Sequence, residues 1–340
     1  MTGCPPTVVT EALGPIPGFV FDGLGEKAFL GCMNDAALSP NLIAEQKGFV
    51  PAAAINRFLA SVAKRSGDEL FAIHYLSQLS VLDYGIWGEY VLEAPSLLDA
   101  ILRATRIIHL HASDDHLTLD VGTNTATFRY LYAERKVEGY PQVAIMSAKA
   151  MISLAHHYLG STWSPLYMGF DLSERGRSSR LETVFDCPIR FGHRCLELEI
   201  SKADLLAPNP KSPGVQYLTR QDVERANGGG PPQRYSDIVA NILRQNLGYD
   251  QSSIDSVAQT LRLSKRTLQR RLDLEGHSFR ELLAEVKMQR AVELLGERDI
   301  SISALAETLD YATPSHFARA FRSSFGVSPT NFRAQRGHRN

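Results

Sequence analysis

An internal repeat near the C-terminus constrains the fold of this chain more than any other feature. The segment 257–261 (VAQTL) resembles 305–309 (LAETL) at an offset of 48 residues, and 268–272 (LQRRL) resembles 317–321 (FARAF) at an offset of 49. The one-residue difference falls between the matched segments, where it changes only the length of a turn. Each copy is therefore predicted to be a helix, a short turn and a second helix.

The apolar residues of each copy have the spacing needed to close a small core between two crossing helices. In the first copy these residues are Val257, Leu261, Leu268 and Leu272. In the second copy they are Leu305, Leu309, Phe317, Phe321 and Phe325. This pattern is typical of a helix-turn-helix motif, which the chain is predicted to contain twice.

The second helix of each copy keeps polar residues on its outer face. In the first copy these include Ser264, Lys265, Arg266, Gln269, Arg270 and Arg271. In the second they include Thr313, Ser315, His316, Arg319 and Arg322. A helix fits the major groove of B-DNA, where Arg and Gln can pair with base edges while Ser, Thr and Lys suit phosphates. A single basic helix is more often a solvated face, but two copies with Arg at the equivalent place favour DNA binding.

Between the copies, residues 279–295 are predicted to form one helix about 25 Å long. Such a connector could hold the two outer helices about 34 Å apart, which is one turn of DNA. One polypeptide could then contact two successive faces of the major groove.

A glycine triplet followed by two prolines, at 228–232, can hold neither a helix nor a central strand. We therefore predict an effector-binding or dimerisation domain over 1–226, a linker over 227–235 and a DNA-binding domain over 236–340. Charge is divided in the same way, since residues 236–340 carry a net charge of +3 and the remainder −4. A basic C-terminal domain is consistent with nucleic-acid binding at that end only.

The front domain is predicted to be α+β, followed by an all-α domain with its two motifs joined by a long helix. Helical periodicity marks 52–65, 95–110 and 143–159 in the front domain. Alternation indicates a hairpin over 116–121 and 126–132, and a further strand-like stretch over 188–200.

Composition excludes several classes. No apolar run approaches the roughly 18 residues needed to cross a bilayer, and the N-terminus lacks the order of a signal peptide, so a cytoplasmic location is expected. Four cysteines without a CxxC pair argue against a disulfide scaffold or a structural zinc site. His109, His111 and His116 could suggest a metal, but isolated histidines are more often hydrogen-bonded groups, so no metal and no cofactor are expected.

The C-terminal part resembles the AraC family of bacterial regulators over about 236–336. The most specific stretch runs from Ile300 to Phe332, and the family ending is matched by Phe325-Gly-Val-Ser-Pro329 and Phe332-Arg333. The resemblance implies that Arg270 and Arg319 are the main base-contacting residues. It implies as further base contacts Arg266, Gln269, Ser315 and His316, and the expected phosphate contacts are Ser264, Lys265, Arg271, Thr313 and Arg322.

Two positions depart from the family pattern. The family often places glycine in the turn between the helices, where Arg262 and Asp310 stand here, and Pro314 opens the second outer helix. Asp tolerates unusual backbone angles and proline suits a first helical turn, so the fold is expected to persist.

The front domain resembles the arabinose-binding-like sensor region of one AraC subgroup over about 20–210. The similar segments are 84–89, 94–100 and 185–191. Such domains bind small effectors, dimerise, or both, which implies a homodimer on DNA.

We therefore expect a transcription regulator that binds promoter DNA under the control of an unidentified small molecule and contacts RNA polymerase. Tyr84, Trp87 and Tyr90 are the candidate effector pocket, although such an aromatic cluster is more often simply core. One alternative is a ligand-independent regulator whose front domain only dimerises or contacts polymerase. A second is an enzyme fused to a DNA-binding tail, but Cys187 and Cys195 lack the setting of a reactive thiol, so no catalytic residue is expected.

Overall fold

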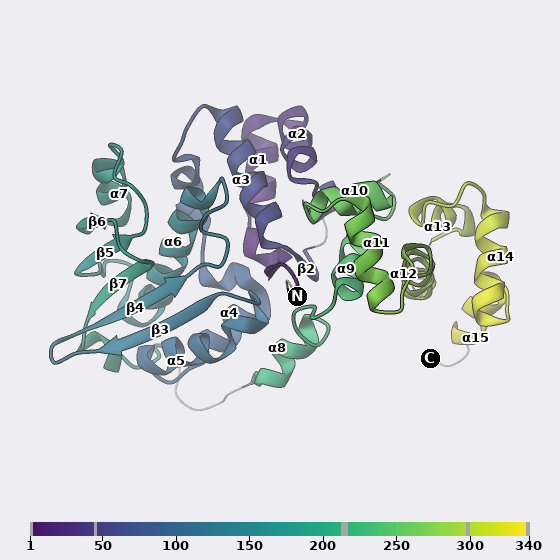
Figure 1. Cartoon of the computed structure of the whole chain (residues 1–340). Helices are drawn as coiled ribbons and strands as arrows, with labels where there is room; N and C mark the ends of the chain where they lie inside the picture. The colour runs from purple at the N-terminus through teal and green to yellow at the C-terminus, as the bar shows by residue number, and fades with distance from the viewer. Residues whose placement is uncertain (1–2, 44–45, 212–216, 250, 297–299, 338–340) are drawn as a thin grey trace. The chain divides into compact units, whose positions relative to one another are not determined.

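The contacts in a computed structural model divide the chain into two compact units. One unit consists of residues 5–36 and 42–231, and the other of 232–340 with the short segments 3–4 and 37–41. The residues that the structure describes are 3–43, 46–211, 217–249, 251–296 and 300–337. We call the unit of residues 5–36 and 42–231 the N-terminal unit, and the other the C-terminal unit (Figure 1).

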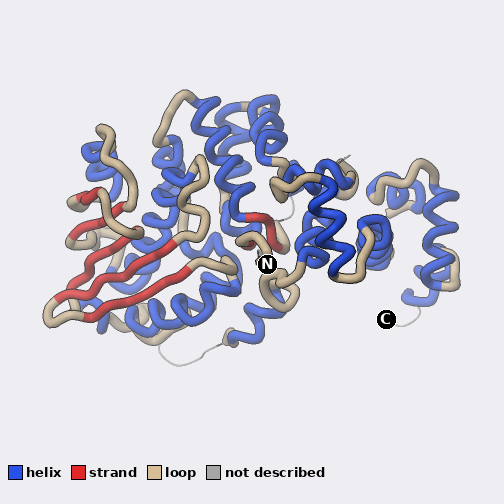
Figure 2. Tube along the Cα trace, viewed as in Figure 1, coloured by secondary structure: helices blue, strands red, loops and turns tan. Residues whose placement is uncertain are grey.

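The N-terminal unit contains a five-stranded sheet in the order β3-β4-β7-β5-β6, beside the short antiparallel pair β1-β2 (Figure 2). The sheet strands are β3 His116–Val121, β4 Thr125–Leu131, β5 Tyr167–Phe170, β6 Ile189–Phe191 and β7 Leu196–Ser201. The small pair is β1 Thr7–Val9 and β2 Phe49–Pro51. All neighbours in the sheet are antiparallel except β5 and β6, which are parallel. The hairpin predicted over 116–132 is confirmed as β3 and β4.

The described residues of this unit also form eight α-helices. They are α1 Ile16–Leu24, α2 Glu26–Ala36, α3 Ala52–Ser66, α4 Gly85–Leu92, α5 Leu97–Ile107, α6 Tyr140–Leu159, α7 Ser178–Phe185 and α8 Arg220–Ala226. The helices predicted from periodicity are confirmed as α3, α5 and α6. Helix α5 packs against β3 and α6 against β7. The mixed composition of helices and strands expected for the front domain is therefore confirmed.

The stretch 188–200 differs from the prediction of one strand. It forms two strands, β6 and β7, which lie on opposite sides of β5 in the sheet. Gly192 between them has a φ of 79°, a left-handed conformation that ends the extended run and that glycine adopts without steric cost. Both strands bury every second residue, so the alternation of apolar and polar residues continues across Gly192. The sequence pattern alone therefore did not reveal that the strand is interrupted there.

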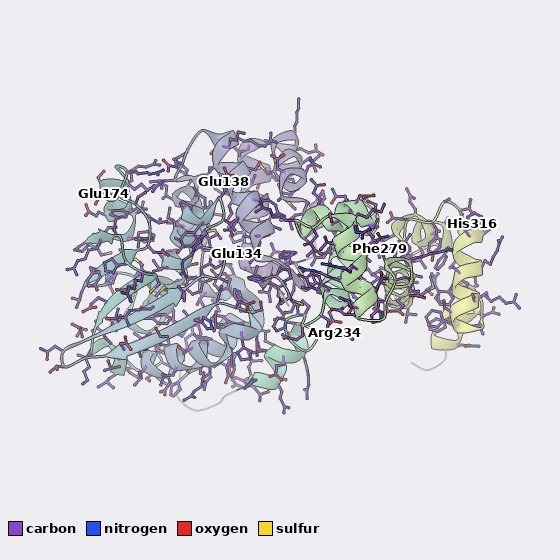
Figure 3. The ribbon with its side chains drawn as sticks, in the orientation of Figure 1. Glu134, Glu138, Glu174, Arg234, Phe279 and His316 are labelled. Carbon is purple, nitrogen blue, oxygen red and sulfur yellow. The ribbon has the colours of Figure 1, made fainter. Side chains whose placement is uncertain are left out.

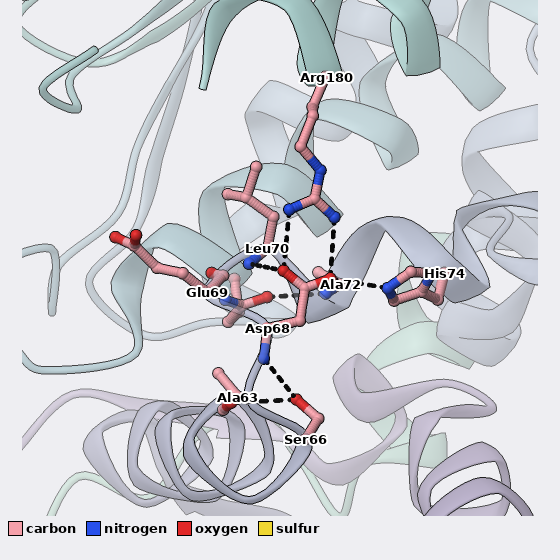
Figure 4. A network of polar contacts seen from close by, with 9 residues as sticks. Ala63, Ser66, Asp68, Glu69, Leu70, Ala72, His74 and Arg180 are labelled. Atoms are coloured by element: carbon pink, nitrogen blue, oxygen red, sulfur yellow. Dashed lines mark hydrogen bonds and ion pairs between the residues drawn. The ribbon is translucent and has the colours of Figure 1, made fainter. Parts of the chain in front are cut away.

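The carboxylate of Asp68 connects the segment that follows α3 to helix α7 through several hydrogen bonds (Figure 4). Both oxygens of Asp68 accept hydrogen bonds from the Arg180 guanidinium, at 2.9 and 2.8 Å. The same carboxylate accepts from the Leu70 amide at 2.9 Å and lies 2.8 Å from Nε2 of His74. These donors, Arg180 above all, hold the pKa of Asp68 well below its usual range.

The C-terminal unit is built from helices alone in its described parts. They are α9 Tyr235–Asn246, α10 Ile254–Thr260, α11 Lys265–Leu274, α12 Phe279–Leu294, α13 Ile302–Thr308, α14 Pro314–Phe325 and α15 Pro329–Gly337. Helices α10 and α11 are the predicted first copy, α13 and α14 the second, and α12 lies between them in sequence. Across the described residues of the whole chain, no helix is both long enough and apolar enough to pass through a bilayer.

One apolar cluster serves all of these helices up to α14, and α15 adds Phe332 at its edge. Leu268 and Leu272 of α11 are fully buried in it, as are Phe317 and Phe321 of α14. The ring centroids of Phe317 and Phe321 lie 5.7 Å apart, and the Phe321 centroid is 5.3 Å from that of Phe332. Burial of these rings fixes the orientation of α14 and leaves its polar residues on the outside.

Replacing Phe317 by Ala should lower the free energy of unfolding of the C-terminal unit by about 3–5 kcal/mol, because the change leaves a cavity in a closed core. Hydrogen exchange measured by mass spectrometry across a urea series would follow the peptides of α13 and α14 separately. Leu274→Ala is the matched control, since Leu274 is 81% exposed and its truncation should change stability by less than about 0.5 kcal/mol. Equal effects of the two substitutions would contradict the role of Phe317 in the core.

Candidate functional site

Helix α11 presents a row of exposed polar side chains. The helix starts at Ser264, whose hydroxyl accepts a hydrogen bond from the Thr267 amide at 3.1 Å and so satisfies one of the free N–H groups of the first turn. Arg266, Gln269 and Arg270 are all exposed. Their i, i+3, i+4 spacing places them on one face of the helix, opposite Leu268 and Leu272.

Helix α14 presents a comparable row. Thr313 caps it by accepting from the His316 amide at 3.2 Å, and Pro314 occupies the first helical position, where it needs no hydrogen-bond partner. The exposed polar residues of this helix include Ser315, His316, Arg319 and Arg322. Figure 3 labels His316, which lies near the start of α14.

The cations on these two helices differ in whether the protein already neutralises them. Within the described residues, no carboxylate pairs with the four arginines Arg266, Arg270, Arg319 and Arg322. By contrast, Lys265 lies 3.1 Å from a carboxylate oxygen of Asp255. The guanidinium of Arg271 lies 4.2 Å from the centroid of the Tyr235 ring, so this side chain is directed at α9. The four arginines are the groups best placed to meet an external anion.

The turns of the two helix pairs have the same backbone geometry. Arg262 and Asp310 are both left-handed, with φ of 54° and 52°. In each turn the next residue donates its amide to a carbonyl five positions back, Leu263 to Ala258 and Tyr311 to Ala306, both at 2.9 Å. This is the Schellman ending of a helix, and it explains why glycine would suit both positions. The repeat found in the sequence is thus a repeat in backbone conformation.

Asp310 compensates for its strained backbone with contacts that glycine could not make. One carboxylate oxygen accepts from the Gly248 amide and the other from the Ser252 hydroxyl, both at 3.0 Å. Its carbonyl oxygen accepts from the Lys287 ammonium of α12, also at 3.0 Å. The turn between α13 and α14 is therefore tied to α12 and to the loop that precedes α10.

Arg262→Gly should raise the free energy of unfolding of the C-terminal unit by about 0.5–1 kcal/mol, because it removes left-handed strain from an exposed residue. Asp310→Gly should instead lower it by about 1 kcal/mol, since two side-chain hydrogen bonds are lost. Urea denaturation with hydrogen-exchange detection would compare the variants. Stabilisation by both substitutions would show that the Asp310 contacts contribute nothing.

The N-terminal unit encloses an apolar hollow between its sheet and helices α4, α5 and α6. A neighbouring hollow shares four of its lining residues. The shared residues are Tyr84, His111, Tyr130 and Ser147. We call the two hollows together the sensor cavity.

Local backbone geometry brings Tyr84 and Trp87 to the wall of this cavity. Gly88 lies where helix α4 touches the chain before it, and a Cβ at this position would lie 1.9 Å from the carbonyl oxygen of Val81. Only glycine allows this approach. The indole Nε1 of Trp87 donates to the Ile107 carbonyl at 3.1 Å, which leaves its ring to line the cavity.

The three aromatic residues predicted to line an effector pocket do not lie in the same cavity. Tyr84 and Trp87 line the sensor cavity, whereas Tyr90 is not among its lining residues. Tyr90 lies about one turn after Trp87 on α4. The centroid of its ring is 5.0 Å from the guanidinium of Arg103 on α5. Sequence analysis missed His111, Tyr130 and Ser147 as lining residues. These residues come from separate elements, so no local sequence pattern groups them.

One buried titratable group, His111, lines the cavity, and a second, Asp115, is bonded to the lining residue Tyr130. Burial lowers the pKa of His111 to about 4, so the imidazole is neutral at pH 7. Burial also raises the pKa of Asp115 to about 6, against the opposing effect of hydrogen bonds from the Tyr130 hydroxyl and the Ala133 amide. Of its charged neighbours, Asp114 raises and His116 lowers this pKa.

The thiols and the histidines offer little chemistry. Burial raises the pKa of Cys187 to about 12 and also raises that of Cys195, so both remain protonated at neutral pH. In the portion of the chain that is described, no three His, Cys, Asp or Glu side chains come together as a metal site would require.

Asp115→Asn should change how the stability of the N-terminal unit depends on pH. Because the folded-state pKa of Asp115 lies above its unfolded value, its contribution is fully present below pH about 4 and is lost as pH rises through about 6. The stability of the wild type relative to the variant should fall by about 2 kcal/mol between pH 4 and pH 7.

Tryptophan fluorescence during urea denaturation measures this difference. Both tryptophans, Trp87 and Trp163, belong to the N-terminal unit, so the signal reports that unit alone. The titration of His111 has the opposite sign but occurs in both proteins, and it cancels in the comparison. A difference that stays constant with pH would show that Asp115 titrates normally.

Comparison with known families gives two matches along the chain. The model described as the arabinose-binding domain of AraC transcription regulators, N-terminal, matches residues 30–209, which is more than half of the chain. A helix-turn-helix domain model matches residues 257–335, which include both helix pairs.

Individual relatives carry related names. The HTH-type transcriptional regulator VirS of Mycobacterium tuberculosis is 25% identical over 259 residues, covering 72% of each chain. The HTH-type transcriptional regulator GadX of Escherichia coli is 31% identical over 94 residues, covering 28% of this chain and 34% of its own. Among solved structures, the transcriptional regulator CdpR from Pseudomonas aeruginosa matches with 21% identity and a TM-score of 0.36, covering 78% of this chain and 86% of its own.

Proposed function

Since this chain belongs to the AraC family of transcription regulators, we propose that it binds promoter DNA with two helices, α11 and α14, each in the major groove. Membership of the family makes this chain a DNA-binding regulator. We propose in addition which of its residues contact the DNA. The observation that carries it is the repeated geometry of the two pairs. Both have the same left-handed turn, and both second helices expose arginines that no described carboxylate neutralises.

Base contacts are assigned to the exposed face of each helix. Arg270 and Arg319 occupy equivalent places in the repeat, and an arginine can form two hydrogen bonds to a guanine edge. The supporting base contacts are Arg266, Gln269, Ser315 and His316. Their i, i+3, i+4 spacing with the two arginines makes one continuous strip on each helix.

Phosphate contacts are assigned to the borders of these strips. The capping residues Ser264 and Thr313 lie at helix N-termini, where free amides and the helix dipole favour an anion. Arg322 is exposed one turn after Arg319. Lys265 would have to leave Asp255, and Arg271 the ring of Tyr235, so these two are the weakest assignments.

The spacing of the two outer helices is assigned to α12. Its 16 residues correspond to about 24 Å, and the helix pairs at its two ends would supply the rest of the roughly 34 Å between successive major-groove faces on one side of B-DNA. We infer that a single chain contacts both faces.

The N-terminal unit is proposed to control this binding. We assign effector binding and dimerisation to residues 1–226, with 227–235 as a linker that carries three left-handed glycines, Gly228, Gly229 and Gly230. A small molecule that favours one conformation of this unit would shift the population that is competent to bind DNA. Contact with RNA polymerase and a homodimer on DNA complete the proposal.

Arg270→Ala and Arg319→Ala should each weaken specific binding by about 1–3 kcal/mol, because each removes a bidentate base contact. Fluorescence anisotropy with DNA from upstream of this protein's own gene, at several salt concentrations and with competitor DNA, measures the loss. The stoichiometry of the same titration distinguishes one bound chain from two.

Arg225→Ala is the matched control. It removes the same charge from α8 of the N-terminal unit, where the side chain is 75% exposed. Its affinity should equal that of the wild type within error. Salt-sensitive binding without sequence preference, unchanged in all three variants, would mean only phosphate attraction and would refute base contact by these helices.

A further inference from the structure

We propose that the sensor cavity binds an uncharged and mainly apolar small molecule, whose single polar group forms a hydrogen bond with His111. The inference rests on the proposed effector control and adds the chemical class of the effector. It also makes His111, rather than an arginine or a lysine, the group that recognises the polar end.

The lining of the cavity selects against charge. Its residues are aliphatic and aromatic apart from His111, Ser147 and the tyrosine hydroxyls, and no Lys, Arg, Asp or Glu is among the described residues that line either hollow. An ionised ligand would lose its hydration there and find no opposite charge, which is a large penalty. A carboxylate or an amine is therefore a poor occupant.

A carboxylate ligand faces a second obstacle. Asp115 lies directly behind the cavity wall, where it accepts a hydrogen bond from the hydroxyl of Tyr130. This buried acid is partly ionised near pH 6 and fully so above it, since its pKa is about 6. Its negative charge would repel an anion across the Tyr130 ring.

His111 is the polar group that the fold leaves unsatisfied at the cavity. The residue is only 7% exposed, and its Nδ1 has no hydrogen-bond partner. The ring packs against two aromatic neighbours, with centroids 4.8 Å from Tyr84 and 5.1 Å from Trp87. Buried polar atoms are nearly always paired, so an unpaired atom at a cavity indicates a bond completed by a ligand.

The neutral state of His111 sets what it can bond. A neutral imidazole has one donor and one acceptor nitrogen, so it suits a hydroxyl, an amide or a carbonyl. A sugar such as arabinose is a poor fit, because most of its hydroxyls would enter an apolar space without partners.

Three brominated probes with one carbon skeleton test this class. They are 4-bromobenzyl alcohol (neutral, with a hydroxyl), 4-bromobenzoate (anionic at pH 7) and 4-bromotoluene (no polar group). Bromine quenches tryptophan fluorescence on contact. In the full-length Trp163→Phe protein, Trp87 is the only fluorophore of its kind and lines the cavity. Without DNA, we expect saturable quenching by the alcohol, binding of the benzoate at least about tenfold weaker, and no effect of L-arabinose.

His111→Leu in the same background separates recognition from folding. The alcohol should lose about fivefold in affinity, because its hydrogen bond is gone. Binding of 4-bromotoluene should be unchanged, which shows that the cavity is intact. Benzoate binding tighter than the alcohol, saturable binding of arabinose, absence of saturable binding by any probe, or an alcohol affinity that ignores His111→Leu would each overturn the proposal.

The DNA-binding assay distinguishes a failure of the proposed ligand class from a failure of the proposed regulatory function. Sequence-specific anisotropy binding together with no probe binding would overturn the ligand class and leave the regulator function standing. Saturable, His111-dependent probe binding in a protein that shows no DNA sequence preference would support the ligand class and remove the proposed function.

Discussion

The shared hydrophobic core of the C-terminal unit is the constraint on which its surface depends. Leu268 and Leu272 of the first pair and Phe317 and Phe321 of the second are fully buried in one cluster. Because one face of α11 and one face of α14 are thus fixed inward, the opposite faces must point to solvent. The exposed arginines are on these helices as a geometric consequence of packing, and their freedom from carboxylate partners makes them available to an external anion.

Much of the C-terminal unit could be predicted because its information is local. The repeated segments are five residues long, and the apolar spacing within each helix pair lies in a short window. The departures at Arg262 and Asp310 were visible as well. The structure adds that both are left-handed and that only Asp310 is supported by side-chain contacts.

The sensor cavity could not be predicted to the same extent, because helices and strands far apart in sequence build it. Tyr84 and Trp87 were recognisable as aromatics in a matching segment, but the same reasoning included Tyr90, which packs under Arg103. His111 was considered as a possible metal ligand or, more often, a hydrogen-bonded group, and not as a residue of the effector pocket. Its role depends on which atoms surround it after folding, and no periodicity in the sequence encodes an unpaired Nδ1. The break at Gly192 was hidden for a similar reason, since alternation persists on both sides of it.

The Asp310 turn has a consequence for the promoters that such a protein can use. Its carboxylate holds the loop before the first helix pair, and its carbonyl holds Lys287 of the connecting helix. The two pairs are thus joined at a second point besides the chain itself. Each added base pair turns the groove by roughly 35° and moves it about 3.4 Å. On the proposed binding mode, promoters can therefore evolve in the bases under each helix, while the number of base pairs between these two sites is under much stricter selection.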